Sequence, residues 1–224
     1  MTDTKKDSTN TKLENFIFKN RKAIIAVACV AIVAAVVVCV VVGISDAQTK
    51  KGLDAIDQIE FTYTAKSISI SDSEISARQD KAIADVAPLC EKNGIVGVRA
   101  NMLAADVYYA KKDYSSALNA YLAAADKGKK IYTASICKYN AAVCSEELGN
   151  KEEAVKYFVA SAEDKDFLLS AHALFNAARI QESLGLLNEA AENYKKVVDG
   201  YNNDTWASLS QSRIIDLQAK GKID

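Results

Sequence analysis

Few residues in this sequence could carry out catalysis. His172 is the only histidine, so a nucleophile–histidine pair, a histidine general base or a histidine-rich metal site would each depend on it. Asp164 and Asp166 precede His172, but the sequence has no clustered carboxylates at metal-ligand spacing and no glycine-rich phosphate loop. We therefore interpret His172 as an ordinary groove or surface histidine, and we predict a protein that is not an enzyme, without catalytic residues, metal or cofactor.

The five cysteines show neither a metal-site spacing nor a disulfide framework. Cys29 and Cys39 lie in an apolar block, and no CxxC pair occurs. Cys137 and Cys144 are separated by about 10.5 Å along a helix at about 1.5 Å per residue, whereas bridged Cα atoms lie within about 7 Å. A bridge from Cys90 to Cys137 is conceivable, but three mostly buried thiols in core positions are the simpler expectation.

Charge is distributed unevenly along the chain. Residues 1–22 carry six basic and three acidic side chains, and residues 45–224 carry 22 basic and 26 acidic ones. Nucleic-acid binding requires a basic face, so a mildly acidic domain gives it no support.

The apolar block predicts a membrane span. Residues 23–44 contain no charged side chain, and as a helix they extend about 33 Å, enough to cross a hydrocarbon core of about 30 Å. A cleaved signal peptide normally has a shorter apolar region of about 7–15 residues, and residues 43–47 form a weak cleavage site. A lipoprotein cysteine is also disfavoured, because Cys39 follows Val38 and too little apolar sequence precedes Cys29.

Basic residues predict the orientation of this span. Lys12, Lys19, Arg21 and Lys22 precede it, and only Lys50 and Lys51 closely follow it. The positive-inside rule then places residues 1–22 in the cytoplasm, as a disordered polar tail, and the large domain outside the cytoplasmic (inner) membrane.

The C-terminal half contains internal repeats. Residues 139–158 and 175–194 match at an offset of 36, and residues 102–121 form a weaker copy 37 residues upstream. A period of this size with two helices per unit is typical of a helical solenoid. Small residues recur in the first helix (Ala105, Ala142, Ala178) and in the second (Ala117, Ala154, Ala190), each of the latter followed four residues later by an aromatic (Tyr121, Phe158, Tyr194). Gly149 and Gly185 stand where the first helix should end.

These residues resemble tetratricopeptide repeats (TPRs), although the usual early Trp and closing Pro are missing. The resemblance implies an all-α fold, with an N-terminal transmembrane helix followed by a TPR-like helical-repeat solenoid. We expect a linker helix and N-terminal solenoid helices in 45–96, where Ser71 and Glu74 form a capping box and Pro88 should kink or break a helix that runs to Asn93–Gly94. The expected repeats are 97–131, 132–166 and 167–203, followed by a capping helix at 204–220.

The architecture also resembles the YfgM-like ancillary subunits of the Sec translocon, a family with a short cytoplasmic tail, one membrane helix and an external TPR domain. The TPR resemblance implies a partner-binding groove lined by Arg99, Met102, Asp106, Tyr109, Tyr139, Asn140, Val143, Glu146, His172, Phe175, Asn176, Arg179 and Glu182. Met102, Tyr139 and Phe175 could instead be core between repeats. A clamp for a C-terminal carboxylate is not supported, since only Arg99 and Arg179 lie near the two asparagines.

Two functions follow from these expectations. The first is a membrane-anchored module that binds protein or peptide partners, assisting translocation, folding or envelope assembly. The second is a self-associating envelope scaffold, a homo-oligomer without a peptide-binding groove.

Overall fold

The computed structural model describes residues 4–65, 71–129, 132–164 and 166–223. These residues form nine helices and no strand, which confirms the predicted all-α class with an apolar N-terminal helix ahead of helical repeats. The chain divides into two compact units, Met1–Lys51 and Gly52–Asp224.

Helix α1 runs from Thr4 to Thr64 without interruption. Among the described residues it is the one helix long and apolar enough to cross a membrane, a property that a signal sequence would share. The expected disorder of residues 1–22 is wrong for residues 4–22, which are helical; residues 1–3 lie outside the described range. These 19 residues contain neither Gly nor Pro, so the helix of the apolar segment can propagate through them at little cost once nucleated.

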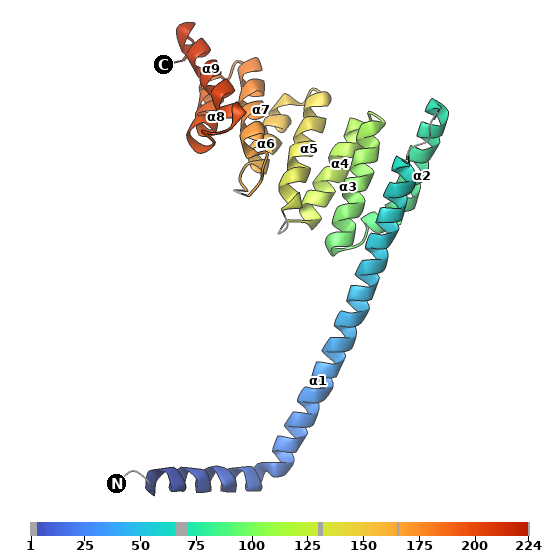
Figure 1. The fold of residues 1–224 in the computed structure, drawn as a ribbon, viewed down its shortest axis with the longest axis vertical. Helices are drawn as coiled ribbons and strands as arrows, with labels where there is room; N and C mark the ends of the chain where they lie inside the picture. Colours follow the sequence, from blue (N-terminus) through green and yellow to red (C-terminus); the bar gives the residue numbers. More distant parts are fainter. Residues whose placement is uncertain (1–3, 66–70, 130–131, 165, 224) are drawn as a thin grey trace. The chain divides into compact units, whose positions relative to one another are not determined.

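The second unit is a succession of helix pairs. After the end of α1 come α2 (Asp72–Cys90), α3 (Gly94–Ala110), α4 (Tyr114–Lys127), α5 (Thr133–Glu147), α6 (Lys151–Ser161), α7 (Ser170–Ser183), α8 (Leu187–Gly200) and α9 (Thr205–Ala219). Each helix packs chiefly against its neighbours in sequence (Figure 1). The pairs α5–α6 and α7–α8 lie within 132–166 and 167–203, and α9 lies within 204–220. Helix α3 begins at Gly94, three residues before the predicted first repeat of 97–131.

Helix α2 begins at the predicted cap. The Ser71 hydroxyl accepts a hydrogen bond from the Glu74 backbone amide, whereas the Glu74 carboxylate pairs with Arg78. Pro88 lies in the last turn, and the helix ends at Cys90 rather than at Asn93–Gly94. Pro88 has no backbone N–H to donate to the carbonyl of Ala84, so the last turn of α2 lacks one hydrogen bond and the helix is less able to continue past Cys90.

The repeated alanines and aromatic residues form the core of the helix pairs. All six repeated alanines, at 105, 142, 178, 117, 154 and 190, have no exposed surface, and Tyr121, Phe158 and Tyr194 are at most 4% exposed. An alanine at each helix contact lets the backbones approach, and the aromatic ring fills the space beside it. The predicted packing positions are confirmed, and Cys137 and Cys144 are buried as expected.

The first helix of each pair ends in the same left-handed turn. Gly149 and Gly185 both have φ of +78°, and the Gly149 amide donates to the Glu146 carbonyl as a helix-ending Schellman motif requires. The equivalent residue at the end of α3 is Lys112, which adopts φ of +60° and donates in the same way to Tyr109. A side chain in this conformation is costly, so the first repeat keeps the turn without the residue best suited to it.

Candidate functional site

The predicted groove residues lie on α3, α5 and α7, the first helices of the three pairs. Asp106 and Arg179 are exposed and the other eleven are half-buried. Many of them contact one another or a neighbouring helix, so the face is partly occupied by the protein's own side chains. In the first pair, Met102 packs beside buried Ala124, Asp106 accepts a hydrogen bond from Tyr121, and the Tyr109 ring meets Tyr114 edge-on.

Aromatic contacts join α5, α7 and α9. The Tyr139 hydroxyl lies 2.9 Å from Nδ1 of His172, and the imidazole stacks on Trp206 with 4.0 Å between ring centroids. Phe175 lies 4.9 Å from Trp206 and 5.5 Å from Tyr194. Tyr139 and Phe175 therefore both line the face and pack between repeats. Burial lowers the pKa of His172, Arg179 lowers it further, and Asp204 opposes both.

Arginines connect successive first helices. Arg99 of α3 lies 2.9 Å from Asp57 of α1. Both carboxylate oxygens of Glu146 on α5 lie 2.8 Å from Nη2 of Arg179 on α7. Arg213 of α9 pairs with Glu182 of α7, donating to one carboxylate oxygen from Nε and to the other from Nη2.

The step from α3 to α5 lacks such a pair. At an offset of 37, Tyr109 stands where Glu146 stands in the next repeat, and at an offset of 36, Val143 stands where Arg179 does. Asn140 and Val143, both half-buried, therefore lie on the less charged part of the face. Asn176 is oriented by Arg179, whose Nε donates to its side-chain oxygen at 3.3 Å.

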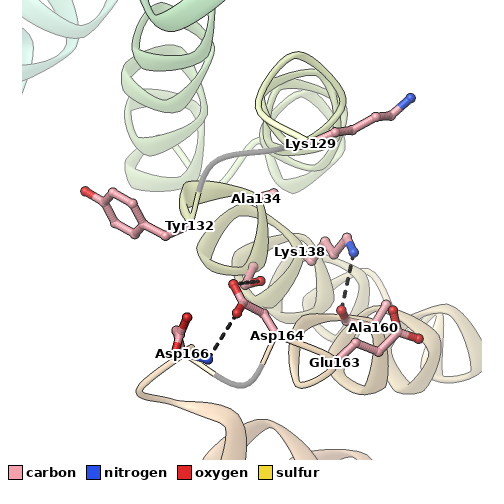
Figure 2. A pocket seen from close by; sticks show the side chains of 9 residues that line it. Lys129, Tyr132, Ala134, Lys138, Ala160, Glu163, Asp164 and Asp166 are labelled. Atoms are coloured by element: carbon pink, nitrogen blue, oxygen red, sulfur yellow. Dashed lines mark hydrogen bonds between the residues drawn. The ribbon is translucent and has the colours of Figure 1, made fainter. Parts of the chain in front are cut away.

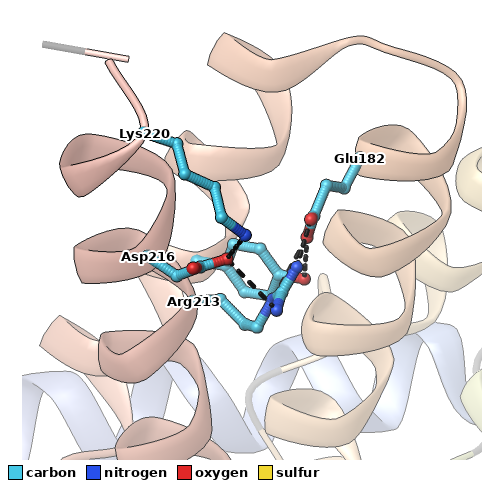
Figure 3. Close-up of polar contacts among 5 residues, drawn as sticks. Glu182, Arg213, Asp216 and Lys220 are labelled. Carbon is cyan, nitrogen blue, oxygen red and sulfur yellow. Dashed lines mark hydrogen bonds and ion pairs between the residues drawn. The ribbon is translucent and has the colours of Figure 1, made fainter. Parts of the chain in front are cut away.

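A pocket lies on this face between α7 and α9. Its volume is about 350 Å³, and its lining consists of Phe175, Arg179, Glu182, Ser183, Tyr194 and Arg213. Figure 3 shows Arg213 pointing from α9 toward Glu182 of α7, with Asp216 and Lys220 completing the network. The Tyr194 hydroxyl donates to Glu182 at 3.2 Å, and burial beside that carboxylate raises the pKa of Tyr194 to about 12.

Three of these pocket residues were predicted and three were missed. Phe175, Arg179 and Glu182 follow from the repeat register. The three missed lining residues are Ser183, Tyr194 and Arg213. Tyr194 was expected only as a repeat aromatic, and Arg213 lies on α9, which was expected only as a capping helix. The spacing of 34 between Arg179 and Arg213 was the available signal that α9 takes the place of a further first helix.

A second pocket of about 460 Å³ lies at the edge where α5 and α7 begin (Figure 2). Its lining carries Lys129, Lys138, Glu163, Asp164 and Asp166. The Lys138 amine donates to the Ala160 carbonyl, and the Ser135 hydroxyl donates to Asp164. No sequence pattern indicated this pocket, because its walls come from two loops that are distant in sequence.

No group of three or more His, Cys, Asp or Glu side chains placed to hold a metal ion occurs among the described residues. Burial raises the pKa of the Cys137 and Cys144 thiols to about 12 in each case, so neither is a thiolate at neutral pH.

The tetratricopeptide repeat family matches residues 171–199. A TPR repeat-containing protein of Treponema pallidum (strain Nichols) is 32% identical over 152 residues, which are 66% of this chain and 64% of that relative. The match thus spans less than two thirds of the relative's length. No solved structure matches the chain. TPR repeats are interaction modules and typically not catalytic. The chain therefore carries a tetratricopeptide repeat, formed by α7 and α8, within a domain of similar helix pairs.

Proposed function

We propose that this chain is a membrane-anchored TPR module that binds a segment of a protein partner along the first-helix face. The observation that carries the proposal is the pocket between α7 and α9, where Phe175 and Tyr194 provide an apolar surface beside the Arg179 and Arg213 guanidinium groups. Small apolar pockets with a few placed polar groups are typical binding sites.

The pocket suits an apolar side chain of a peptide whose backbone runs beside Arg179. Nε and Nη2 of Arg179 are used on Asn176 and Glu146, so Nη1 is the part of the guanidinium left to bond a peptide carbonyl. Arg213 is already paired with Glu182 and Asp216. Because the nearby carboxylates balance both arginines, a neutral peptide segment fits better than an anion.

The membrane location rests on α1. We propose that residues 23–44 span the cytoplasmic membrane with the repeat domain on its outer face, in agreement with the Lys/Arg distribution. A role in translocation, folding or envelope assembly would follow from the resemblance to ancillary translocon subunits.

Site-specific photocrosslinking tests the binding proposal. A photoreactive residue at Phe175 of the full chain in its native membrane should give adducts of defined mass. The same residue at Lys195, exposed on α8, is the matched control and should give none. Equal adducts from both positions would mean that the first-helix face has no special affinity.

Protease accessibility tests the topology. In spheroplasts, external protease should degrade residues 52–224, and a domain that resists protease until the membrane is lysed would reverse the assignment.

Self-association is a second candidate, and α9 is the observation that favours it. Its Leu209 and Ile215 are 43% and 55% exposed. Light scattering on the detergent-solubilised chain distinguishes the two: a monomeric mass excludes the scaffold, and an oligomer that Ile215→Ser converts to monomer supports it.

A further inference from the structure

We infer that the protein segment bound along the first-helix face carries a lysine or arginine that pairs with Asp106, in the step between α3 and α5. The inference rests on the proposed peptide-binding function and adds to it the charge of the partner and the place of that charge along the face. Asp106 does not line the apolar pocket between α7 and α9, so the two contacts can be tested separately.

The step between α3 and α5 differs from the other three steps along this face. In each of those, an arginine of the later helix pairs with a carboxylate of the earlier one: Arg99 with Asp57, Arg179 with Glu146 and Arg213 with Glu182. Val143 of α5 precedes Arg179 by 36 residues, and Asp106 of α3 precedes Val143 by 37. A carboxylate therefore stands in α3 at the repeat position where α7 carries an arginine, and α5 supplies no cation for it.

The Asp106 carboxylate is held in place by the core. Tyr121 of α4, which is 4% exposed, donates a hydrogen bond to it. Burial raises the pKa of Cys137 on α5, and the charge of Asp106 adds to that increase. The carboxylate thus lies within electrostatic range of α5, and its position is fixed before a partner arrives.

Among the described residues, no lysine or arginine forms an ion pair with Asp106. Asp106 reaches the surface, yet enough protein surrounds its carboxyl group that burial raises its pKa; the hydrogen bond from Tyr121 opposes this, and Glu60 raises the pKa further. Because part of the desolvation cost is already met in the free protein, a cation from a partner would gain a charge-assisted hydrogen bond there. A carboxylate from a partner would be repelled.

Two aromatic rings beside Asp106 favour a long basic side chain over a simple cation. Tyr109 is three residues further along α3, and residues at this spacing are neighbours on a helix surface. Its ring meets Tyr114 edge-on, with 5.3 Å between ring centroids. Lysine and arginine pack their apolar stems on such rings and gain from a cation held over a ring face.

The distance between Asp106 and the pocket sets the spacing within the bound segment. Two first-helix steps separate the α3–α5 step from the α7–α9 pocket. A helix with its side chains is about 10–12 Å wide, so the separation is about 20–24 Å. An extended chain advances about 3.3 Å per residue. The basic residue should therefore lie about six or seven positions from the apolar side chain that fills the pocket.

A synthetic peptide array tests the inference. Each peptide has a central leucine in a serine and threonine background, and one other position in turn carries lysine, glutamate or serine. The full chain, purified in detergent, is applied to the array, and the best lysine peptide is then titrated by fluorescence anisotropy. The variants are Asp106→Asn, Asp106→Lys, Phe175→Ala and the matched control Asp199→Asn, which removes an exposed carboxylate from α8. Far-UV circular dichroism checks that each variant keeps its helical content.

Binding should be tightest with lysine about six or seven positions from the leucine. Asp106→Asn should weaken it about threefold to tenfold, Asp199→Asn should leave it unchanged, and Asp106→Lys should prefer glutamate at the same position. Equal binding of the lysine, glutamate and serine peptides, or equal loss in the two Asp→Asn variants, would overturn the inference; if Phe175→Ala still abolishes binding, the proposed function stands. Peptides that bind regardless of Phe175, or no binding at all, would refute the proposed function and the inference with it.

Discussion

Residue 112 offers a test of how the first helix of each pair ends. In the structure Lys112, Gly149 and Gly185 adopt the same left-handed conformation in the same hydrogen-bonded turn. A Cβ added at Gly149 or Gly185 meets no atom within 4 Å, so substitution changes the backbone energy and not the packing. Gly149→Ala should therefore be destabilising and Lys112→Gly stabilising.

The magnitude follows from two opposing terms. The left-handed conformation costs a residue with a Cβ about 1–2 kcal/mol of folding free energy. Glycine lowers the free energy of unfolding by about 0.4–1 kcal/mol relative to alanine, because it gives the unfolded chain more conformational freedom. The difference is about 1 kcal/mol in each direction, or about 2–4 °C in melting temperature for a domain of this size. Thermal unfolding of the full chain in detergent, followed by far-UV circular dichroism, measures it.

Gly200 is the matched control. It also has open space at the Cβ position, but its φ is not positive and it ends α8. Gly200→Ala should therefore stabilise by up to about 1 kcal/mol, opposite in sign to Gly149→Ala. If Lys112→Gly lowers the melting temperature, or if the two Gly→Ala variants shift it in the same direction, the assignment of the shared turn is refuted.

Three further predictions concern packing, protonation and charge. Ala142→Leu should cost about 1–3 kcal/mol by overpacking a fully buried contact, whereas Lys151→Leu at an exposed site should be nearly silent; equal melting temperatures would show that the repeat register is wrong. Burial lowers the pKa of His172 below its ordinary value of 6.5, so the unfolded state binds a proton at a higher pH than the folded state does. The contribution of His172 to the free energy of unfolding should therefore be fully present above pH 6.5 and be lost as the pH falls through the folded-state pKa. His172→Gln should flatten that part of the pH profile, and an unchanged profile would exclude His172 as its source. Arg213→Ala removes a partly exposed ion pair with Glu182 and should cost no more than about 1 kcal/mol in urea unfolding; a much larger loss would mean that the pair holds α9 in place.

The repeat core could be predicted from sequence because its signals are local. Each alanine and the aromatic four residues later lie on one helix, and the pattern recurs, so register and burial follow from spacing alone. The helix ends at Gly149 and Gly185 were equally predictable, since glycine is the residue that a left-handed helix end favours. Lys112 was not, because nothing in its side chain indicates a positive φ.

The candidate site could be predicted only in part. The register identified Phe175 and Arg179, but the pocket also depends on Arg213 of α9, which was expected only as a capping helix. The Trp206–His172 stack and the pairing of Arg99 with α1 depend on how separate helices meet, which composition does not encode. Residues 4–22 show a third limit, because their polarity suggested disorder while the adjacent apolar helix extends through them.

The nearest-neighbour packing of these helices also governs how the domain opens. In such an array the free energy of each unit is tied mainly to the next one along the chain, so the array can unravel from an end while its middle stays folded. Helix α9 packs against α8 and, less extensively, against α7, and it forms one wall of the pocket that Phe175 and Arg179 share. A peptide bound in this pocket would contact both α7 and α9 and so stabilise the docked position of α9. At a free peptide concentration [L], it would add RT ln(1 + [L]/Kd) to the free energy that keeps α9 docked. Amide hydrogen exchange in α9 should therefore slow when the pocket is filled, well before exchange in α3 or α5 responds.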